Sequence, residues 1–438
     1  MSHKIFNHIP PIEYKGVNNK DPMAFNFYEA EREIYGKTMR DHLRFSVCYW
    51  HSFNWLGNDV FGDGAFPRPW LTGENNHQDA LHKLDAAFDF FERLGASFFC
   101  FHDVDMASHG NSVKELTENV KKISEPLAKK MSDTGIKLLW GTANLFSHPR
   151  YMAGAATNPN PEIFKCAAAQ VHCMLETTHQ LNGENYVLWG GREGYDTLLN
   201  TDIKQELEQL ARFLSLVVEH KHKIGFRGTL LIEPKPHEPT KHQYDFDSAS
   251  CIALIRKAGL ENEIYLNIEV NHATLSGHNF EHEINYAIAN NALGSVDINR
   301  GDTLLGWDTD QFPNNPADLL MAFYYIYLNG GFKQGGLNFD AKIRRQSTDP
   351  EDLFYAHIGG MDVAARTLLA VEKMINDNEL LNYIKNRYKD WDKGLGNFIH
   401  DKKNNLESIA KKVIDNNLNP HPRSGNQEFL ENMINKYL

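Results

Sequence analysis

Glu269 lies at the end of a segment that has the character of a buried strand. The stretch from Tyr265 to His278 reads YLNIEVNHATLSGH, and its first half is apolar and rich in β-branched residues. Because burying a carboxylate costs several kcal/mol unless it is paired or coordinated, Glu269 must have a partner. His272 follows after the strand end and a turn, and it can serve the same partner. The spacing indicates a bound cation.

Other carboxylates follow similar segments or belong to the acidic motif GWDTDQFP. With Glu269 they form a set of six: Glu233, Glu269, Asp297, Asp308, Asp310 and Asp340. If they converged without cations, they would repel one another and raise one another's pKa. Two divalent ions and the Lys235 ammonium would supply five positive charges against those six. In an extended segment, Asp308 and Asp310 would point the same way and could hold one ion. Glu269 is therefore predicted to bridge two metal ions.

The donor types narrow the identity of these ions. Hard oxygen donors with a single imidazole and no thiolate favour magnesium or manganese over structural zinc, and cobalt is a plausible substitute. The chain has 21 histidines. We therefore interpret others, such as His278, His282 and His357, as ordinary polar or core residues.

Eight short apolar segments alternate with polar loops and longer amphipathic stretches. We predict strands at Phe45 to Trp50, Ser97 to Asp103, Lys137 to Asn144, Asn185 to Gly191, Gly228 to Lys235, Ile264 to Val270, Leu293 to Asn299 and Gly335 to Lys342. Helices are predicted at 79–94, 111–131, 162–181 and 203–222, each long enough for a crossover. Eight βα units predict an α/β protein with a (β/α)8 TIM barrel.

The barrel would bring the polar residues at its strand ends to one face. These residues are Trp50, His102, Asn144, Trp189, Glu233, Glu269, Asp297 and Asp340, one for each strand. Any one of them alone could equally be a cap or a satisfied loop residue. Four carboxylates together favour a site.

Three regions are expected along the chain. They are an N-terminal extension (1–44), the catalytic barrel (45–363) and a helical C-terminal arm (364–438). The arm is polar with an apolar stripe, which predicts subunit contacts.

Composition opposes several functional classes. The net charge is −12 and no basic block is present, which argues against binding to nucleic acid or to an anionic membrane. The sequence has no run of eighteen apolar residues, and its opening MSHKIFNHIP lacks the apolar centre of a signal peptide. Five scattered cysteines fit reduced thiols. We expect a cytoplasmic enzyme that needs no dinucleotide, because no GxGxxG motif follows the first strand.

Eight motifs together give the chain a close resemblance to the xylose isomerases of the longer, class II type. The motifs are FHDVD, GTANLFSHPRY, WGGREGY, IEPKPHEPTKHQYD, NIEVNHATLSGHNFEHE, VDINRGD, GWDTDQFP and GGLNFDAK. They run in family order and spacing, and the resemblance extends from about residue 35 to residue 395. It implies a (β/α)8 barrel with a helical arm that wraps a neighbouring subunit, and a homotetramer.

The resemblance also implies roles for individual residues. One metal would be held by Glu233, Glu269, Asp297 and Asp340, and the other by Glu269, His272, Asp308 and Asp310. His102, oriented by Asp105, would assist opening of the cyclic sugar. Lys235 would face the carbonyl oxygen of the open-chain aldose.

The same resemblance implies the residues that contact the sugar. Trp50 and Trp189 would wall the pocket, with Thr142 and Phe146 as further lining residues. Phe61 resembles the aromatic residue that family members insert from an adjacent subunit. The chain departs from the family pattern beside the expected ligands, at His237, Val270 and Ile298. These departures would affect packing there, and through it metal preference or turnover.

The expected reaction is the interconversion of D-xylose and D-xylulose by ring opening and a metal-assisted 1,2-hydride shift, with D-glucose and D-fructose as weaker substrates. One alternative is a phosphodiesterase acting on abasic DNA, which the negative net charge opposes. The other is a carbohydrate-binding or structural protein that stores metal for stability. Lys235 opposes the latter, because storage needs no cation beside the acidic cluster.

Overall fold

The computed structural model describes residues 5–438 and divides into two compact units. The first runs up to Arg366, and the second from Thr367 to Leu438. This division lies inside the helix α11 (Pro350–Asp377), three residues beyond the boundary proposed from the sequence.

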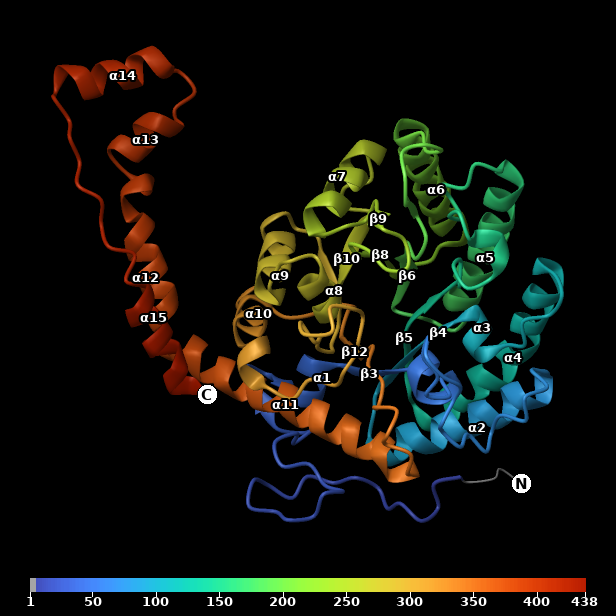
Figure 1. Cartoon of the computed structure of the whole chain (residues 1–438). Helices are drawn as coiled ribbons and strands as arrows, with labels where there is room; N and C mark the ends of the chain where they lie inside the picture. The colour runs from blue at the N-terminus through green and yellow to red at the C-terminus, as the bar shows by residue number, and fades with distance from the viewer. Residues whose placement is uncertain (1–4) are drawn as a thin grey trace. The chain divides into compact units, whose positions relative to one another are not determined.

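The first unit is built on a closed barrel of eight parallel strands (Figure 1). In order around the barrel, the strands are β3 (Phe45–Cys48), β4 (Phe98–His102), β5 (Lys137–Thr142), β6 (Asn185–Trp189), β8 (Thr229–Glu233), β10 (Ile264–Glu269), β11 (Leu293–Asp297) and β12 (Leu337–Phe339). Pairing of β12 with β3 closes it. Each strand lies within one of the eight predicted segments, so the predicted (β/α)8 barrel is confirmed.

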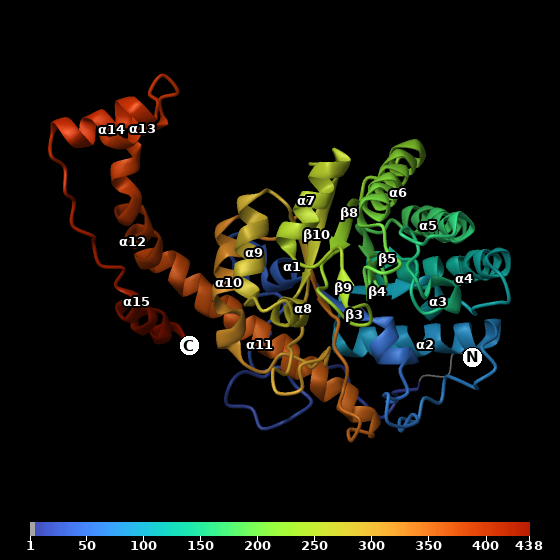
Figure 2. The ribbon, with the colours of Figure 1, turned by 45° about the horizontal axis from the view of Figure 1, so that its top comes forward.

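Helices surround the barrel, as the two views in Figure 1 and Figure 2 show. The main helices that follow the strands are α2 (His77–Leu94), α4 (Val113–Thr134), α5 (Pro161–Gln180), α6 (Ile203–Ile224), α7 (Ser248–Ala258), α9 (Phe280–Ala289), α10 (Pro316–Leu328) and α11. The four predicted helices correspond to α2, α4, α5 and α6, with ends within three residues.

Local sequence explains where these helices begin and end. The Asn76 side chain accepts from the backbone N–H groups of Gln78 and Asp79, which caps α2. At the other end of this helix, Gly95 has a φ of +75°, a left-handed conformation that glycine adopts without steric cost. This glycine therefore ends α2 three residues before β4 begins.

The barrel interior is apolar along the strands and becomes polar at their carboxyl ends. Its core packs Phe98, Cys100, Leu139, Trp140, Val187 and Leu231. Because side chains alternate along a strand, the inward residue two positions after Cys100 is His102, and the one two positions after Leu231 is Glu233. The apolar layer thus supports polar side chains at the carboxyl ends of the strands.

Shorter elements complete the first unit. They are the antiparallel pairs β1 (Glu33–Ile34) with β2 (Lys37–Thr38) and β7 (Gly194–Tyr195) with β9 (His242–Gln243), and the short helices α1 (Met39–Leu43), α3 (Asp103–Met106) and α8 (Val270–Leu275). A π-helical turn (Trp50–Asn54) follows β3. Phe6, Ile9 and Ile12 of the N-terminal segment are buried.

The second unit is helical. It contains the end of α11 and then α12 (Glu379–Tyr388), α13 (Leu395–His400), α14 (Leu406–Asp415) and α15 (Gln427–Ile434). Within residues 5–438, no helix combines the length and the apolarity needed to cross a membrane.

Candidate active site

A cavity of about 200 Å³ opens at the carboxyl ends of the barrel strands. This is the face on which TIM-barrel enzymes carry their chemistry. Twelve of the residues predicted to form a site line it: Trp50, His102, Thr142, Phe146, Trp189, Glu233, Lys235, Glu269, His272, Asp308, Asp310 and Asp340. Asp297 and Asp105 contact lining residues without lining the cavity themselves, and Phe61 lies outside it.

The strand ends position these side chains. His102, Trp189, Glu233, Glu269 and Asp297 are the last residues of β4, β6, β8, β10 and β11, and Asp340 directly follows β12. In the parallel register, Glu269 pairs with Asp297, and Trp189 with Glu233. The predicted clustering at one face is therefore what the backbone produces.

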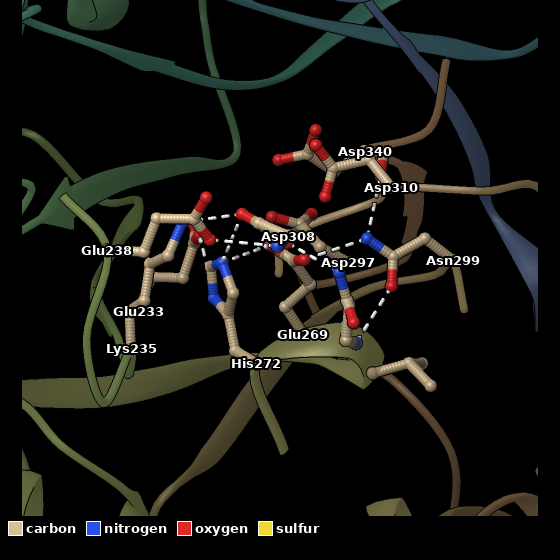
Figure 3. A network of polar contacts seen from close by, with 12 residues as sticks. Glu233, Lys235, Glu238, Glu269, His272, Asp297, Asn299, Asp308, Asp310 and Asp340 are labelled. Atoms are coloured by element: carbon tan, nitrogen blue, oxygen red, sulfur yellow. Dashed lines mark hydrogen bonds and ion pairs between the residues drawn. The ribbon is translucent and has the colours of Figure 1, made fainter. Parts of the chain in front are cut away.

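Four of the carboxylates form a first group (Figure 3). One oxygen from each of Glu233, Glu269, Asp297 and Asp340 can be chosen so that all lie within 4.8 Å of one another. Burial, together with the neighbouring carboxylates, raises the pKa of Glu233 and of Glu269 well above the usual range. Burial and Asp340 raise the pKa of Asp297 to about 8. Such a group calls for positive charge.

A second group surrounds His272. Its Nε2 lies 3.1 Å from Glu269 Oε2 and 3.4 Å from Asp308 Oδ2. Its buried Nδ1 makes no hydrogen bond among the described residues and lies 3.6 Å from Glu233 Oε1. Asp310 also lines the cavity. The spacing argument assumed an extended segment, but the φ of +43° at Asp310 shows that the segment is not extended there.

The donor set fits divalent cations. It consists of crowded, mostly buried carboxylates and one imidazole, whose Nδ1 is buried without a hydrogen-bond partner among the described residues. Oxygen-rich sets of this kind suit magnesium and manganese. Glu269 lies in both groups, as a bridging ligand would.

Lys235 provides a fixed positive charge. Its Nζ lies 2.5 Å from Asp308 Oδ2 and 5.2 Å from the centre of the Trp189 ring. Burial alone would lower the pKa of Lys235, but Asp308, Asp310 and Glu269 outweigh it and raise the pKa above its usual value. In turn Asp308, although partly buried, has its pKa held well below the usual range by Lys235 and His272. The lysine is cationic and the aspartate ionised.

His102 and Asp105 form an oriented pair. The His102 Nδ1 lies 2.7 Å from Asp105 Oδ2, which also accepts the His102 backbone N–H at 2.8 Å. Asn54 donates to the other carboxylate oxygen at 2.8 Å. Burial lowers the pKa of His102, but Asp105 outweighs it and raises the pKa overall. The pair leaves Nε2 of His102 free to face the cavity.

Aromatic residues make up one side of the cavity. Trp50 donates its indole N–H to Asp340 Oδ1 at 2.8 Å, and Phe146 meets Trp189 edge to face with ring centres 4.4 Å apart. The Thr142 hydroxyl donates to the Val187 carbonyl at 2.6 Å. Phe61 is 81% exposed.

Buried asparagines support the carboxylates, and the sequence reasoning missed them. Asn267 Nδ2 donates to Glu233 Oε2 at 3.0 Å and to Asp297 Oδ2 at 2.7 Å. Three further contacts are Asn299 to Glu269 at 2.7 Å, Asn338 to Asp297 at 2.8 Å and Asn271 to Asp308 at 2.5 Å. A signal was available, since Asn267 and Asn338 each precede an acidic strand-end residue by two positions and so share its face.

The sequence reasoning also missed two basic side chains near the acidic groups. His51 Nε2 lies 3.2 Å from Asp310 Oδ2 and 3.0 Å from Asp340 Oδ1. Lys342 Nζ lies 2.8 Å from Asp310 Oδ2. His51 sits in the π-helical turn after β3, which periodicity does not reveal.

The three departures from the family pattern lie outside the cavity lining. Val270 and Ile298 are buried, and the Ile298 N–H donates to the Asn338 carbonyl at 2.7 Å. His237 is half-buried in the loop after β8.

Comparisons with known proteins agree along the whole chain. The family model "XylA2 C-terminal domain" matches residues 384–438. The xylose isomerase of Solibacter usitatus (strain Ellin6076) is 54% identical over 438 residues, covering 100% of both chains. That of Histophilus somni (strain 2336) is 56% identical over 433 residues, covering 99% of both.

Solved structures share the barrel at low identity. A protein assigned as a xylose isomerase from Rhodospirillum rubrum ATCC 11170 has a TM-score of 0.51 at 13% identity, covering 73% of this chain and 98% of its own. One assigned as a sugar phosphate isomerase/epimerase from Anabaena variabilis ATCC 29413 has a TM-score of 0.53 at 14% identity, covering 75% and 98%. At this identity they show the fold alone.

Proposed function

Since the chain belongs to the xylose isomerase family, we propose that it is a metal-dependent aldose–ketose isomerase of the class II type that interconverts D-xylose and D-xylulose. D-glucose and D-fructose are the weaker substrate pair. The observation that carries the proposal is the convergence of five carboxylates, His272 and Lys235 on one cavity at the barrel's carboxyl face, with a sixth carboxylate, Asp297, next to three of the five.

Two divalent ions, Mg²⁺ or Mn²⁺ with Co²⁺ as a substitute, would be held by the two groups described above. Glu233, Glu269, Asp297 and Asp340 would hold one ion, and Glu269, His272, Asp308 and Asp310 the other. When bound, such ions polarise the oxygens of the open-chain sugar and so favour movement of a hydride between its first two carbons.

His102 is placed to open the ring. With Nδ1 held by Asp105, its Nε2 faces the cavity and can give a proton to the ring oxygen O5. The Asp105 carboxylate stabilises the protonated imidazole from which that proton comes. As the C1–O5 bond breaks, the O1 hydroxyl gives up its proton to solvent, and C1 becomes an aldehyde.

Lys235 and the aromatic wall then act on the open chain. The Lys235 ammonium can donate to O1, where negative charge develops as the hydride moves from C2 to C1. The proton on O2 passes to O1, so that the product has a carbonyl at C2 and a hydroxyl at C1. Trp50 and Trp189 exclude water from the carbons that exchange hydride.

The exposed Phe61 supports an assembly. Because it is 81% exposed and lies outside its own cavity, it is available to a neighbouring subunit. We place the protein in the cytoplasm as a homotetramer, with the region 364–438 as an arm for subunit contacts and 1–44 as an N-terminal extension.

The decisive experiment is ketose formation from D-xylose by metal-stripped protein, with and without Mg²⁺, Mn²⁺ or Co²⁺ and with no nicotinamide. We expect added metal to restore xylulose production, and we expect the rate of that production to differ among the three ions. Absence of product from folded, metal-loaded protein would overturn the substrate assignment. The variant His272→Ala should weaken one ion selectively, which calorimetric titration detects.

A further inference from the structure

Two histidines and a glutamate lie together on the outer helices, away from the cavity. His172 and Glu176 are four residues apart on α5, so they share a face of that helix. His220 projects from α6, which lies beside α5 in both views (Figure 1, Figure 2). One ligand atom from each residue can be chosen so that all three lie within 4.8 Å of one another.

The donor separations in this cluster are close to those of a metal site. Glu176 Oε1 lies 3.4 Å from His172 Nε2 and 3.7 Å from His220 Nε2. Donors placed about 2.0–2.1 Å from a tetrahedral zinc ion lie about 3.3–3.4 Å apart. The two imidazole rings are close, with centres 4.3 Å apart and planes tilted by 31°.

His220 carries the strongest indication. Its Nε2 is buried and makes no hydrogen bond among residues 5–438. Leaving a buried polar atom unpaired costs about 1–3 kcal/mol. Burial, the neighbouring His172 and the nearby Lys223 lower the pKa of His220 and together outweigh Glu176, which raises it. The ring is therefore neutral at neutral pH, which is the form that binds metal.

We propose that His172, Glu176 and His220 form a peripheral binding site for zinc-type transition metals, separate from the carboxylate-rich centre in the barrel. Two imidazoles and one carboxylate suit Zn²⁺, whereas the hard ions Mg²⁺ and Mn²⁺ prefer oxygen donors. A fourth position remains open to solvent, because the His172 side chain is 56% exposed. The ion would tie α5 to α6, the helices that lead into β6 and β8.

Equilibrium dialysis of the full chain against Zn²⁺, in a large excess of Mg²⁺, tests the site by difference. Bound zinc per chain is measured for the wild type and for His172→Asn, Glu176→Gln and His220→Asn. Each variant should hold one zinc fewer, because losing a direct ligand weakens binding by more than the roughly 10- to 100-fold that an outer partner costs. Any zinc in the barrel centre is the same in all samples and cancels.

His282→Asn is the matched control. His282 also belongs to a cluster of two histidines and a glutamate, with His278 and Glu283. There, however, His278 is already paired with Glu283 at 2.6 Å, and Ser248 N–H donates to the same glutamate at 2.7 Å. The control should keep the wild-type zinc count.

Two results would overturn the proposal. One is an equal zinc count in the wild type and His172→Asn, a substitution at an exposed side chain that the fold tolerates. The other is a loss of zinc in His282→Asn that equals the loss in His220→Asn, which would indicate unspecific binding to surface histidines. Diffraction from zinc-soaked crystals at the zinc absorption edge should place an anomalous peak between α5 and α6.

Discussion

Replacing Asn267 with leucine should weaken one metal ion and spare the other. Asn267 is fully buried, and its amide donates to Glu233 and Asp297, two proposed ligands of the same ion. Both hydrogen bonds lower the pKa of the carboxyl group that accepts them. Leucine has a similar shape and no donor, so both carboxylates become harder to ionise and bind metal less well.

The size of the effect follows from the contacts. Hydrogen bonds to charged groups contribute about 1.5–3 kcal/mol each, so two contribute about 3–6 kcal/mol. The Asn267 Oδ1 is buried without a partner among the described residues. Leucine removes this unpaired oxygen, which offsets about 1–3 kcal/mol of the free energy lost with the two hydrogen bonds. Taken at the middle of both ranges, about 4.5 and about 2 kcal/mol, the net loss of about 2.5 kcal/mol weakens the ion about 60-fold.

Calorimetric titration of metal-stripped protein with Mn²⁺ measures both ions. Asn271→Leu is the matched control, because Asn271 donates to Asp308 of the other group and should weaken the other ion. Asn338→Leu removes one hydrogen bond, to Asp297, and should cost less than Asn267→Leu. Circular dichroism checks that each variant is folded. The reasoning would be refuted if Asn267→Leu and Asn271→Leu weakened the same ion, or if Asn267→Leu bound both ions as the wild type does.

Three further predictions concern charge. Lys235→Met should retain both metals yet lose at least about 100-fold in turnover, because the donor to O1 is gone; near wild-type ketose formation would remove Lys235 from the mechanism. Asp105→Asn should lower turnover at least about tenfold. Because this substitution lowers the pKa of His102, the fall of kcat/KM at alkaline pH should move to lower pH. An unchanged pH profile would contradict the role of the His102–Asp105 pair. The metal-stripped protein should lose stability as pH rises from about 4 to about 8, since Glu233, Glu269 and Asp297 hold protons that the unfolded chain has released. Urea unfolding at several pH values measures this, and a stability that rises over the same range without metal would be evidence against it.

The barrel and its acidic face were predictable because they depend on local patterns. Strand segments such as Ile264 to Val270 are short, apolar and bounded by turn residues, and eight of them admit few topologies. Parallel strands then place their last residues on one face, so Glu233, Glu269 and Asp297 are brought together by the topology itself. Predicting that these three residues cluster needed no knowledge of side-chain packing.

The supporting residues depend on tertiary packing, which a linear pattern does not contain. His51 reaches Asp310 and Asp340 only because β3 is followed by a π-helical turn. The positive φ of Asp310 is likewise set by the fold of its loop, and it defeats an argument from spacing in an extended chain. Asn267 was visible as a residue, but its role depends on which carboxylates lie above it.

The basic side chains beside the carboxylates divide the proposed metal centre into two electrostatically different halves. Asp308 is ionised beside Lys235 and His272, and the partly buried Asp340 has its pKa lowered by His51 and by the Trp50 N–H. Glu233, Glu269 and Asp297 form no direct ion pair with a lysine or arginine among the described residues, and their pKa values are raised instead. An ion entering among these three must displace protons, whereas one entering beside Asp308 meets a carboxylate already charged. The ion that includes Glu233 and Asp297 should therefore depend more steeply on pH. Asn267 matters for this reason. Its two hydrogen bonds favour the ionised state of two carboxylates that have no ion pair with a lysine or arginine among the described residues.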